Sequence, residues 1–274
     1  MDNTDLPNLN ANPSPEGPAA EEEPSHTDKL VGVFTEPESM YKKTALFPPK
    51  TIDWVIPLIV LTVISIISSY IVLSNAEIAY NIKREQIAKI EKSFQEMVDK
   101  GQMTKEQAQE QMDRIEERMS EGTSMVQTII FTIVRVFLFF FIVTGIYFLA
   151  AKFFFKGEGT YTTAMVANGL TAYIDVVQVI IATILTIALG RLFMDTSIAS
   201  IIHVEKSTFA GFLLGKLDII TIWSLAIVSI GLAKMFKSEK IGKYFIFVFG
   251  LWIVWGVILF GLGQAVPFLR FLGG

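Results

Sequence analysis

Five long runs of apolar residues constrain this chain more than any other feature. They cover residues 52–73, 126–148, 174–193, 219–236 and 241–260, and each is bounded by charge or by a turn signal. A helix that crosses about 30 Å of hydrocarbon needs roughly 20 mostly apolar residues. The sequence therefore predicts an all-α fold, a polytopic membrane helical bundle with five transmembrane helices.

The charged residues are concentrated before the second apolar run. Residues 1–123 hold 21 of the 27 acids and 12 of the 23 bases, whereas the remaining 151 residues hold six acids and 11 bases. This imbalance is typical of a polar N-terminal part followed by a membrane domain. The integral-membrane location follows from it, and the lipid bilayer is the first expected partner.

The part before the first apolar run divides in two. Residues 1–28 contain seven acids and no base, with many Pro, Asn and Ser, which predicts a disordered acidic tail. This tail either stays solvated without a partner or binds one. Residues 29–51 predict one or two short interfacial helices, because Thr35 and Glu38 have capping-box spacing and apolar residues lie beside lysines. These helices are expected on the cytoplasmic membrane face or against the inner ends of the bundle.

The segment 75–123 predicts an extramembrane helical hairpin. Apolar residues recur at helical spacing up to Gly101, and Thr104 with Gln107 has the spacing of a capping box that opens a second helix. The first arm is expected to continue the first membrane helix. The charged surface of the hairpin is typical of a coiled coil, either packed on itself as a stalk or contacting a partner or a second copy.

One apolar stretch precedes the third run. Residues 161–173 are apolar but contain Asn168 and Gly169, which predicts a short re-entrant or interfacial helix before the membrane helix proper.

Basic residues in short loops predict the orientation. With a cytoplasmic N-terminus, the inner segments carry ten Lys and the short outer segments carry four Lys or Arg. No apolar signal region precedes the first run in residues 1–50. The expected location is the bacterial inner membrane, with the N-terminus cytoplasmic and the C-terminus outside.

Charged residues within the apolar runs are the candidate site residues. Arg135 interrupts the second run, and a charge inside a bilayer needs a partner or a route to water. Asp218 is the candidate partner for a structural pair, and the alternative is that Arg135 snorkels alone to the interface. Asp175 and Lys234 are expected as polar groups at the inner face. Asp175 and Asp218 are then at opposite ends of their helices, which excludes an aspartyl-protease dyad.

No motif indicates catalysis. The chain has no Cys, which excludes disulfides and thiol nucleophiles, and its two histidines, His26 and His203, are far apart in the sequence. No Gly-rich phosphate loop is present. A non-enzyme without cofactor or metal is expected, and no nucleic-acid partner.

Two stretches resemble a known family. Residues 30–73, "LVGVFTEPESMYKKTALFPPKTIDWVIPLIVLTVISIISSYIVL", are similar to the entry segment of bacterial members of the Yip family, named after Ypt/Rab-interacting proteins. Residues 213–258 resemble the last two membrane helices of that domain, with "LD-x-x-T-I-W-S-L" at 217–225. The resemblance implies a Yip-like membrane domain over residues 52–274, five membrane helices and a cytoplasmic N-terminus.

Two functions stay open. The first is a membrane scaffold that recruits an unknown protein through its cytoplasmic face or its hairpin, with homo-oligomers possible. The alternative is a small-molecule or ion transporter or channel-like protein. Eukaryotic relatives in the Yip family bind Rab-type GTPases in vesicle traffic, but the long acidic hairpin sets this chain apart from them.

The orientation can be tested directly because the chain has no native Cys. Single Cys substitutions at Gln102 and Gly273 should react with a membrane-impermeant thiol reagent added outside intact cells. Substitutions at Glu158 and Glu239 should react only after permeabilisation. The opposite pattern would reverse the predicted orientation.

Overall fold

The computed structural model describes residues 22–121 and 125–266, and this part of the chain is helical without strands. Four helices are long and apolar enough to cross a membrane: α3 (Ile52–Ser74), α6 (Met125–Leu149, extended by the π-helix η1, Ala150–Phe154), α7 (Tyr161–Leu189) and α11 (Ile241–Ala265). A fifth crossing requires α9 (Phe209–Gly215) and α10 (Ile219–Met235) together, which are bent by 55°. The predicted all-α polytopic class is confirmed.

Helix α7 is continuous, so the predicted break within residues 161–173 is wrong. Thr160 caps its start by accepting a hydrogen bond from the Thr163 amide, and Gly190 ends it in the left-handed conformation at φ 66°. The two residues that suggested a break make contacts with neighbouring helices instead. Asn168 donates to the Thr144 hydroxyl of α6 at 2.9 Å, and Gly169 lies against the backbone of α3.

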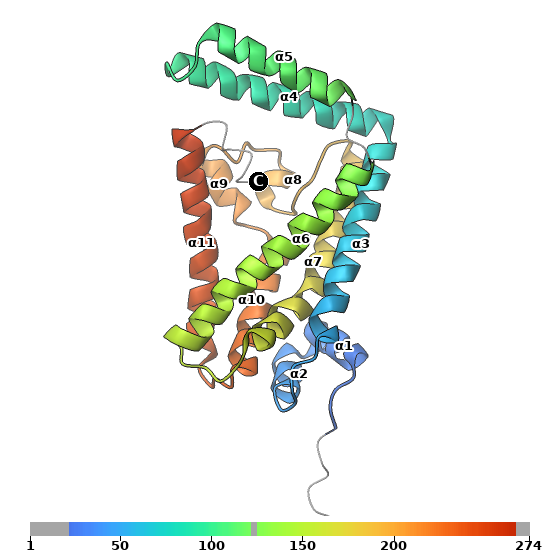
Figure 1. Ribbon diagram of the computed structural model, residues 1–274, viewed down its shortest axis with the longest axis vertical. Helices are drawn as coiled ribbons and strands as arrows, with labels where there is room; N and C mark the ends of the chain where they lie inside the picture. Colours follow the sequence, from blue (N-terminus) through green and yellow to red (C-terminus); the bar gives the residue numbers. More distant parts are fainter. Residues whose placement is uncertain (1–21, 122–124, 267–274) are drawn as a thin grey trace, which may run out of the picture.

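The pair α3–α7 is the most extensive helix contact in the described part of the chain, followed by α7–α10. Helix α6 crosses diagonally in front of α7 in Figure 1, and α11 stands to one side against α10. The main core lies where the start of α7 meets the end of α10, and it includes Ala167, Leu170 and Leu232, all fully buried. Helix α7 therefore holds the bundle together.

Two short helices cover this core at the end of the bundle that we call the N-terminal face. They are α1 (His26–Thr35) and α2 (Pro37–Thr44), and their Val33, Met40 and Tyr41 belong to the main core. Helices α1 and α2 thus pack against the bundle itself, the second of the two placements considered above.

The boundaries of these helices correct two predictions. Helix α1 already begins at His26, capped by Ser25 with Asp28, so disorder up to residue 28 is wrong for residues 22–28. Residues 1–21 of the predicted tail lie outside the described part. The capping box predicted for Thr35 and Glu38 is also absent, because Glu36 takes the N-cap position of α2 and makes no side-chain cap bond.

The segment 75–121 forms two packed helices, α4 (Ala76–Asp99) and α5 (Lys105–Glu121), with Gly101 in a left-handed turn at φ 69°. Helix α4 does not continue α3, contrary to expectation. Asn75 adopts an extended conformation and caps α4 by accepting from the amides of Glu77 and Ile78. The hairpin therefore turns and lies across the end of the bundle, which we call the hairpin face (Figure 1).

Three polar contacts tie α4 to the loops and helix ends of the hairpin face. Asn81 donates to the Gly190 carbonyl at 3.4 Å, and Lys92 pairs with Glu205 at 2.9 Å. Lys100 donates to the carbonyl of Gln264 near the end of α11 at 3.0 Å. The hairpin thereby bridges the ends of α7 and α11.

Gly169 is a place where α7 lies tightly against α3, which makes it a test of the fold. A Cβ there would lie 2.4 Å from the Trp54 Cβ, whereas one at Gly145 in α6 would meet nothing within 4 Å. We expect Gly169→Leu to lower the free energy of unfolding by about 1–3 kcal/mol, since overpacking forces backbones apart. Gly145→Leu is the matched control. Equal melting temperatures of the two variants in detergent would contradict this packing.

Candidate functional site

A buried ion pair joins α1 to the first turn of α3 at the N-terminal face. The Lys29 ammonium donates to the Asp53 carboxylate at 2.5 Å, and the two side chains are 3% and 1% exposed. Asp53 also lies at the positive end of the α3 dipole, which favours a carboxylate. Breaking one partner of such a pair leaves the other charge buried and uncompensated. The pair therefore fixes the position of α1 on the bundle.

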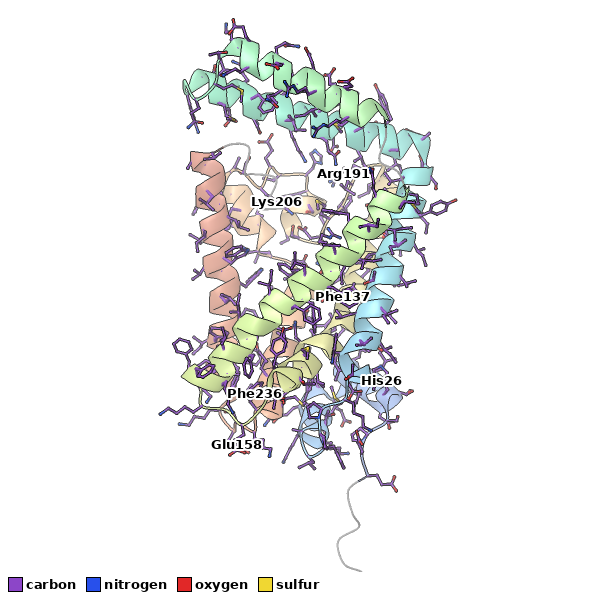
Figure 2. All side chains as sticks on the ribbon, in the orientation of Figure 1. His26, Phe137, Glu158, Arg191, Lys206 and Phe236 are labelled. Carbon is purple, nitrogen blue, oxygen red and sulfur yellow. The ribbon has the colours of Figure 1, made fainter. Side chains whose placement is uncertain are left out.

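His26 extends this pair to α7. Its Nδ1 lies 3.1 Å from the second Asp53 oxygen and its Nε2 lies 2.7 Å from the Tyr173 hydroxyl. An ionised carboxylate only accepts, so in the neutral ring Nδ1 donates to Asp53 and Nε2 accepts from Tyr173. The imidazole is 20% exposed and forms the solvent side of the group. Figure 2 labels it where α1 meets the start of α3.

Residues before α1 reach the same group. Glu23 lies 2.7 Å from Lys50 and 3.6 Å from Lys29. The hydrogen bond from Lys50 is the largest influence on the Glu23 carboxyl, and its pKa is held below the usual range. The chain on both sides of α1 and α2 is thus held to one charged cluster, which we call the His26–Asp53 cluster: Glu23, His26, Lys29, Lys50, Asp53 and Tyr173.

Helix α2 is fixed by a buried tyrosine. The Tyr41 hydroxyl donates to the Ala167 carbonyl of α7 at 2.8 Å. Its ring lies so close to Gly231 of α10 that a Cβ there would be 2.8 Å from the Tyr41 Cζ. Lys234, which was predicted at the inner face, lies in the last turn of α10 and pairs with Glu38 of α2 at 2.9 Å.

A pocket of about 300 Å³ opens beside α2. The connection between α2 and α3 supplies the apolar Leu46 and Phe47 together with Pro48, and the facing wall carries Glu158 and Lys237. Leu46 is 60% exposed. An apolar surface flanked by both charge signs is suited to contact with another protein.

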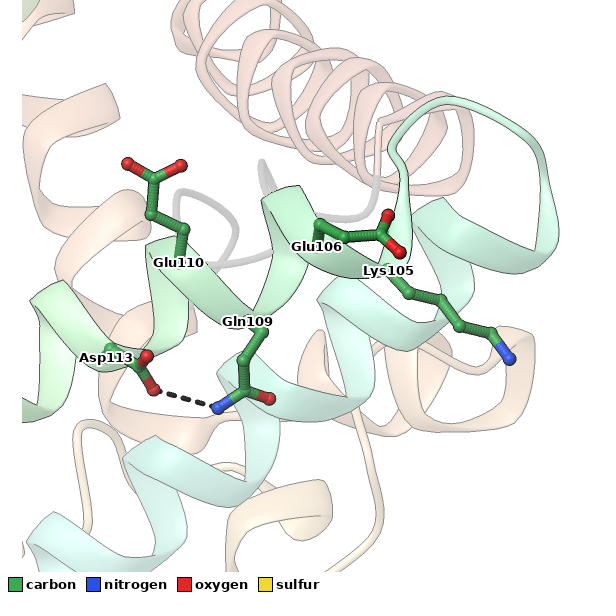
Figure 3. Close-up of a pocket in the computed structure, with 5 residues that line it drawn as sticks. All are labelled: Lys105, Glu106, Gln109, Glu110 and Asp113. Carbon is green, nitrogen blue, oxygen red and sulfur yellow. Dashed lines mark hydrogen bonds between the residues drawn. The ribbon is translucent and has the colours of Figure 1, made fainter.

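A second depression lies on the outer surface of α5 (Figure 3). All five of its lining residues lie on one exposed helix, and the hydrogen bond drawn there joins Gln109 to Asp113 within that helix at 2.8 Å. Side chains on one face of a single helix do not surround a ligand from several sides, so we assign no site to this depression.

The predicted pair of Arg135 and Asp218 is not formed. Both residues belong to the described part of the chain, and no salt bridge joins them within 4.0 Å. Arg135 is exposed on α6. Asp218 is the N-cap of α10, accepting from the amides of Ile220 and Thr221, and it also receives Gln178 at 2.9 Å. Arg135 therefore has no ion pair with Asp218, which agrees with the alternative in which it reaches the interface alone.

Asp175 lies elsewhere than expected. Because α7 begins at Tyr161, Asp175 is in the middle of that helix and not at its inner end. It accepts a hydrogen bond from Ser224 of α10 at 2.9 Å. Asp218 meets Gln178, one turn beyond Asp175, so the two acids are not at opposite ends of the bundle. They still bind different partners and share no proton as a dyad would.

A third polar group holds the loop after α7 at the hairpin face. Asp195 accepts from Ser197 and Ser200 and pairs with Lys206. Burial alone would raise the pKa of Asp195, but the hydrogen bonds from Lys206 and the two serines hold it below the usual range. Figure 2 labels Lys206 in this loop, together with Arg191, which donates to the Ser200 carbonyl at 2.8 Å.

The His26–Asp53 cluster was missed from the sequence. Asp53 is the one acid in residues 52–73, and this signal pointed to a buried partner. In the sequence, His26 lies near the end of the predicted acidic tail and Lys29 opens the predicted interfacial helices, so nothing indicates that both contact Asp53. Among the described residues, no group of three or more His, Asp or Glu could hold a metal ion.

Removing the cation of the buried pair tests its role. Lys29→Met should lower the free energy of unfolding by about 3–5 kcal/mol, because Asp53 stays buried without its ammonium partner. Arg135→Met makes the same change at an exposed site and should alter the melting temperature in detergent little. Lys29→Met with Asp53→Leu should recover part of the loss. Equal melting temperatures for the two single variants would show that the pair is unimportant.

Comparison with known proteins agrees with this architecture. No curated protein and no solved structure matches the chain. The family model of the Yip1 domain matches residues 31–263, which covers the second half of α1, all of α2 to α10 and α11 up to its last two residues. The chain therefore belongs to the Yip1 domain family of membrane proteins.

Proposed function

We propose that this protein is a non-enzymatic membrane scaffold that recruits a protein partner at its N-terminal face. The observation that carries the proposal is the buried Lys29–Asp53 pair, which docks α1 on the membrane bundle. Desolvating two charges is costly, and the best-attested role of such a pair is to fix one arrangement. The arrangement fixed here is that of α1 and α2, two short helices at the end of the bundle.

The surface that results has the composition of a contact site. Exposed Leu46 lines the pocket together with Phe47 and Pro48, with Glu158 and Lys237 at its facing wall. Exposed Lys42 and Lys43 of α2 add positive charge. An apolar centre with a charged rim is typical of protein contacts, in which the rim sets orientation and association rate.

In this proposal the N-terminal face is cytoplasmic and the membrane is the bacterial inner membrane. The ten lysines counted on the inner segments support that orientation through the positive-inside rule. The hairpin would then lie outside and act as a cap. Recruitment of a second copy through the hairpin is the competing arrangement.

Site-specific crosslinking tests the recruiting surface. A photo-crosslinking residue in place of Lys43 should capture a defined partner in cells, and the same residue in place of exposed Glu110 on the hairpin serves as the control. Leu46→Asp should abolish capture from position 43, since it puts a charge into the apolar centre of the contact. It should not change the melting temperature, because Leu46 is 60% exposed.

Two outcomes would overturn the proposal. The first is equal capture of the same partner from positions 43 and 110, which would place the contact elsewhere. The second is capture at position 43 that Leu46→Asp leaves unchanged.

Transport remains a second candidate because of one specific observation. Polar side chains in the middle of α7, residues 168–178, are hydrogen-bonded across helices: Asn168 to Thr144, Tyr173 to His26, Asp175 to Ser224, and Gln178 to Asp218. Polar groups in such a row are common along ion and proton routes. Asp175→Asn distinguishes the candidates, since it should leave partner capture from position 43 intact.

A further inference from the structure

We propose that Asp175 is a proton-binding site inside the membrane bundle, at the contact between α7 and α10. The inference does not rest on the proposed recruiting function. Four features carry it: the position of the residue in the middle of a membrane helix, its incomplete set of partners, the few oxygens around it and the polar groups on either side.

Asp175 is at the midpoint of a long membrane helix, α7. Helix α7 has 29 residues, with 14 before Asp175 and 14 after it. At a rise of about 1.5 Å per residue, the carboxyl lies about 21 Å from either helix end. Charged side chains within membrane helices are costly, and where they occur they commonly belong to proton or ion routes.

The surroundings of Asp175 do not compensate a negative charge. Ser224 donates one hydrogen bond at 2.9 Å, and in the described part of the chain no Lys, Arg or His lies within 4.0 Å of its carboxyl. Asp175 is half-buried, and a single hydroxyl donor offsets only a small part of the cost of taking a carboxylate out of water. Binding a proton removes the charge and with it that cost.

The other two acids within or at the ends of the membrane helices show the contrast. Asp53 has the Lys29 ammonium at 2.5 Å and the His26 ring at 3.1 Å. Asp218 accepts from the amides of Ile220 and Thr221, from Gln178, and from both the amide and the hydroxyl of Thr196. Each of these two carboxylates thus meets a cation or several hydrogen-bond donors. Asp175 has neither a cation nor a set of amide donors.

The ligand is a proton and not a metal ion. Hard metal ions such as Ca²⁺ take six to eight oxygen ligands, whereas in the described part of the chain Asp175 is hydrogen-bonded to one hydroxyl, that of Ser224. Tyr147 of α6 interacts with it electrostatically but makes no hydrogen bond to it. No cluster of three or more His, Asp or Glu is found among the described residues. A proton requires a single oxygen atom.

Polar groups lie within one helical turn of Asp175 on both sides. Tyr173, two residues before it, is hydrogen-bonded to His26, whose ring reaches water at the N-terminal face. Gln178, three residues after it, donates to Asp218 at 2.9 Å and to Thr221 at 3.1 Å. Protonation of Asp175 favours the packed contact of α7 with α10, since an ionised carboxylate there would draw water between the helices.

Infrared spectroscopy of the purified protein in lipid nanodiscs tests the proposal. The difference between wild type and Asp175→Asn at neutral pH should contain the carbonyl band of a protonated carboxyl. That band should give way to carboxylate bands when the pH is raised. Asp218→Asn is the control and should remove carboxylate bands only. Carboxylate bands for Asp175 at neutral pH would overturn the proposal.

A measurement on the wild-type chain covers the case in which Asp175→Asn fails to fold. Dicyclohexylcarbodiimide modifies protonated carboxyls in apolar surroundings, and mass spectrometry locates the adduct. We expect modification of Asp175 and not of Asp218, falling as the pH rises and equal in Na⁺ and K⁺. Protection by Na⁺ at constant pH would assign the site to a metal ion and overturn the proposal. Absence of the adduct at Asp175 at every pH would also overturn it.

Discussion

The arrangement of this bundle depends on one constraint: polar side chains of α7 that leave water must find partners on other helices. Lipid offers no hydrogen bonds, so each unmatched group would cost free energy. Asn168 takes its partner from α6, Tyr173 from α1, and Gln178 from the start of α10. These contacts distinguish one packing from others that would bury a similar apolar area, because apolar helices by themselves pack with little preference in lipid.

The same constraint explains why the N-terminal helices belong to the membrane unit. Helix α1 brings Lys29 to the single acid of α3, and α2 inserts Tyr41 between α7 and α10. Each contact buries a polar group that would otherwise favour water. A partner at this face would therefore meet a surface whose shape is set by the membrane helices, which suits recruitment and gives the bundle a way to influence binding.

The two ends of the molecule are built differently. At the N-terminal face the decisive contacts are buried, as with Lys29 and Asp53. At the hairpin face the contact of Lys92 with Glu205 is more than half exposed on both sides, so water and salt weaken it. Displacing the hairpin should therefore cost less free energy than releasing α1. Asp175 lies between these two ends, and in our proposal a bound proton removes the charge of its carboxylate.

The sequence by itself determined the features that depend on neighbouring residues. Apolar runs of sufficient length predicted the membrane helices, and helical spacing with Gly101 predicted a hairpin. It did not determine which polar groups meet. The sequence placed Arg135 and Asp218 at depths that would allow them to pair. In the structure Asp218 accepts a hydrogen bond from Gln178 instead, and Arg135 is exposed. Asn168 and Gly169 suggested a break, whereas α6 and α3 use them as contact points. Pairing within a membrane depends on which helices are neighbours, and apolar sequences carry little information about that; only the tertiary structure decided it.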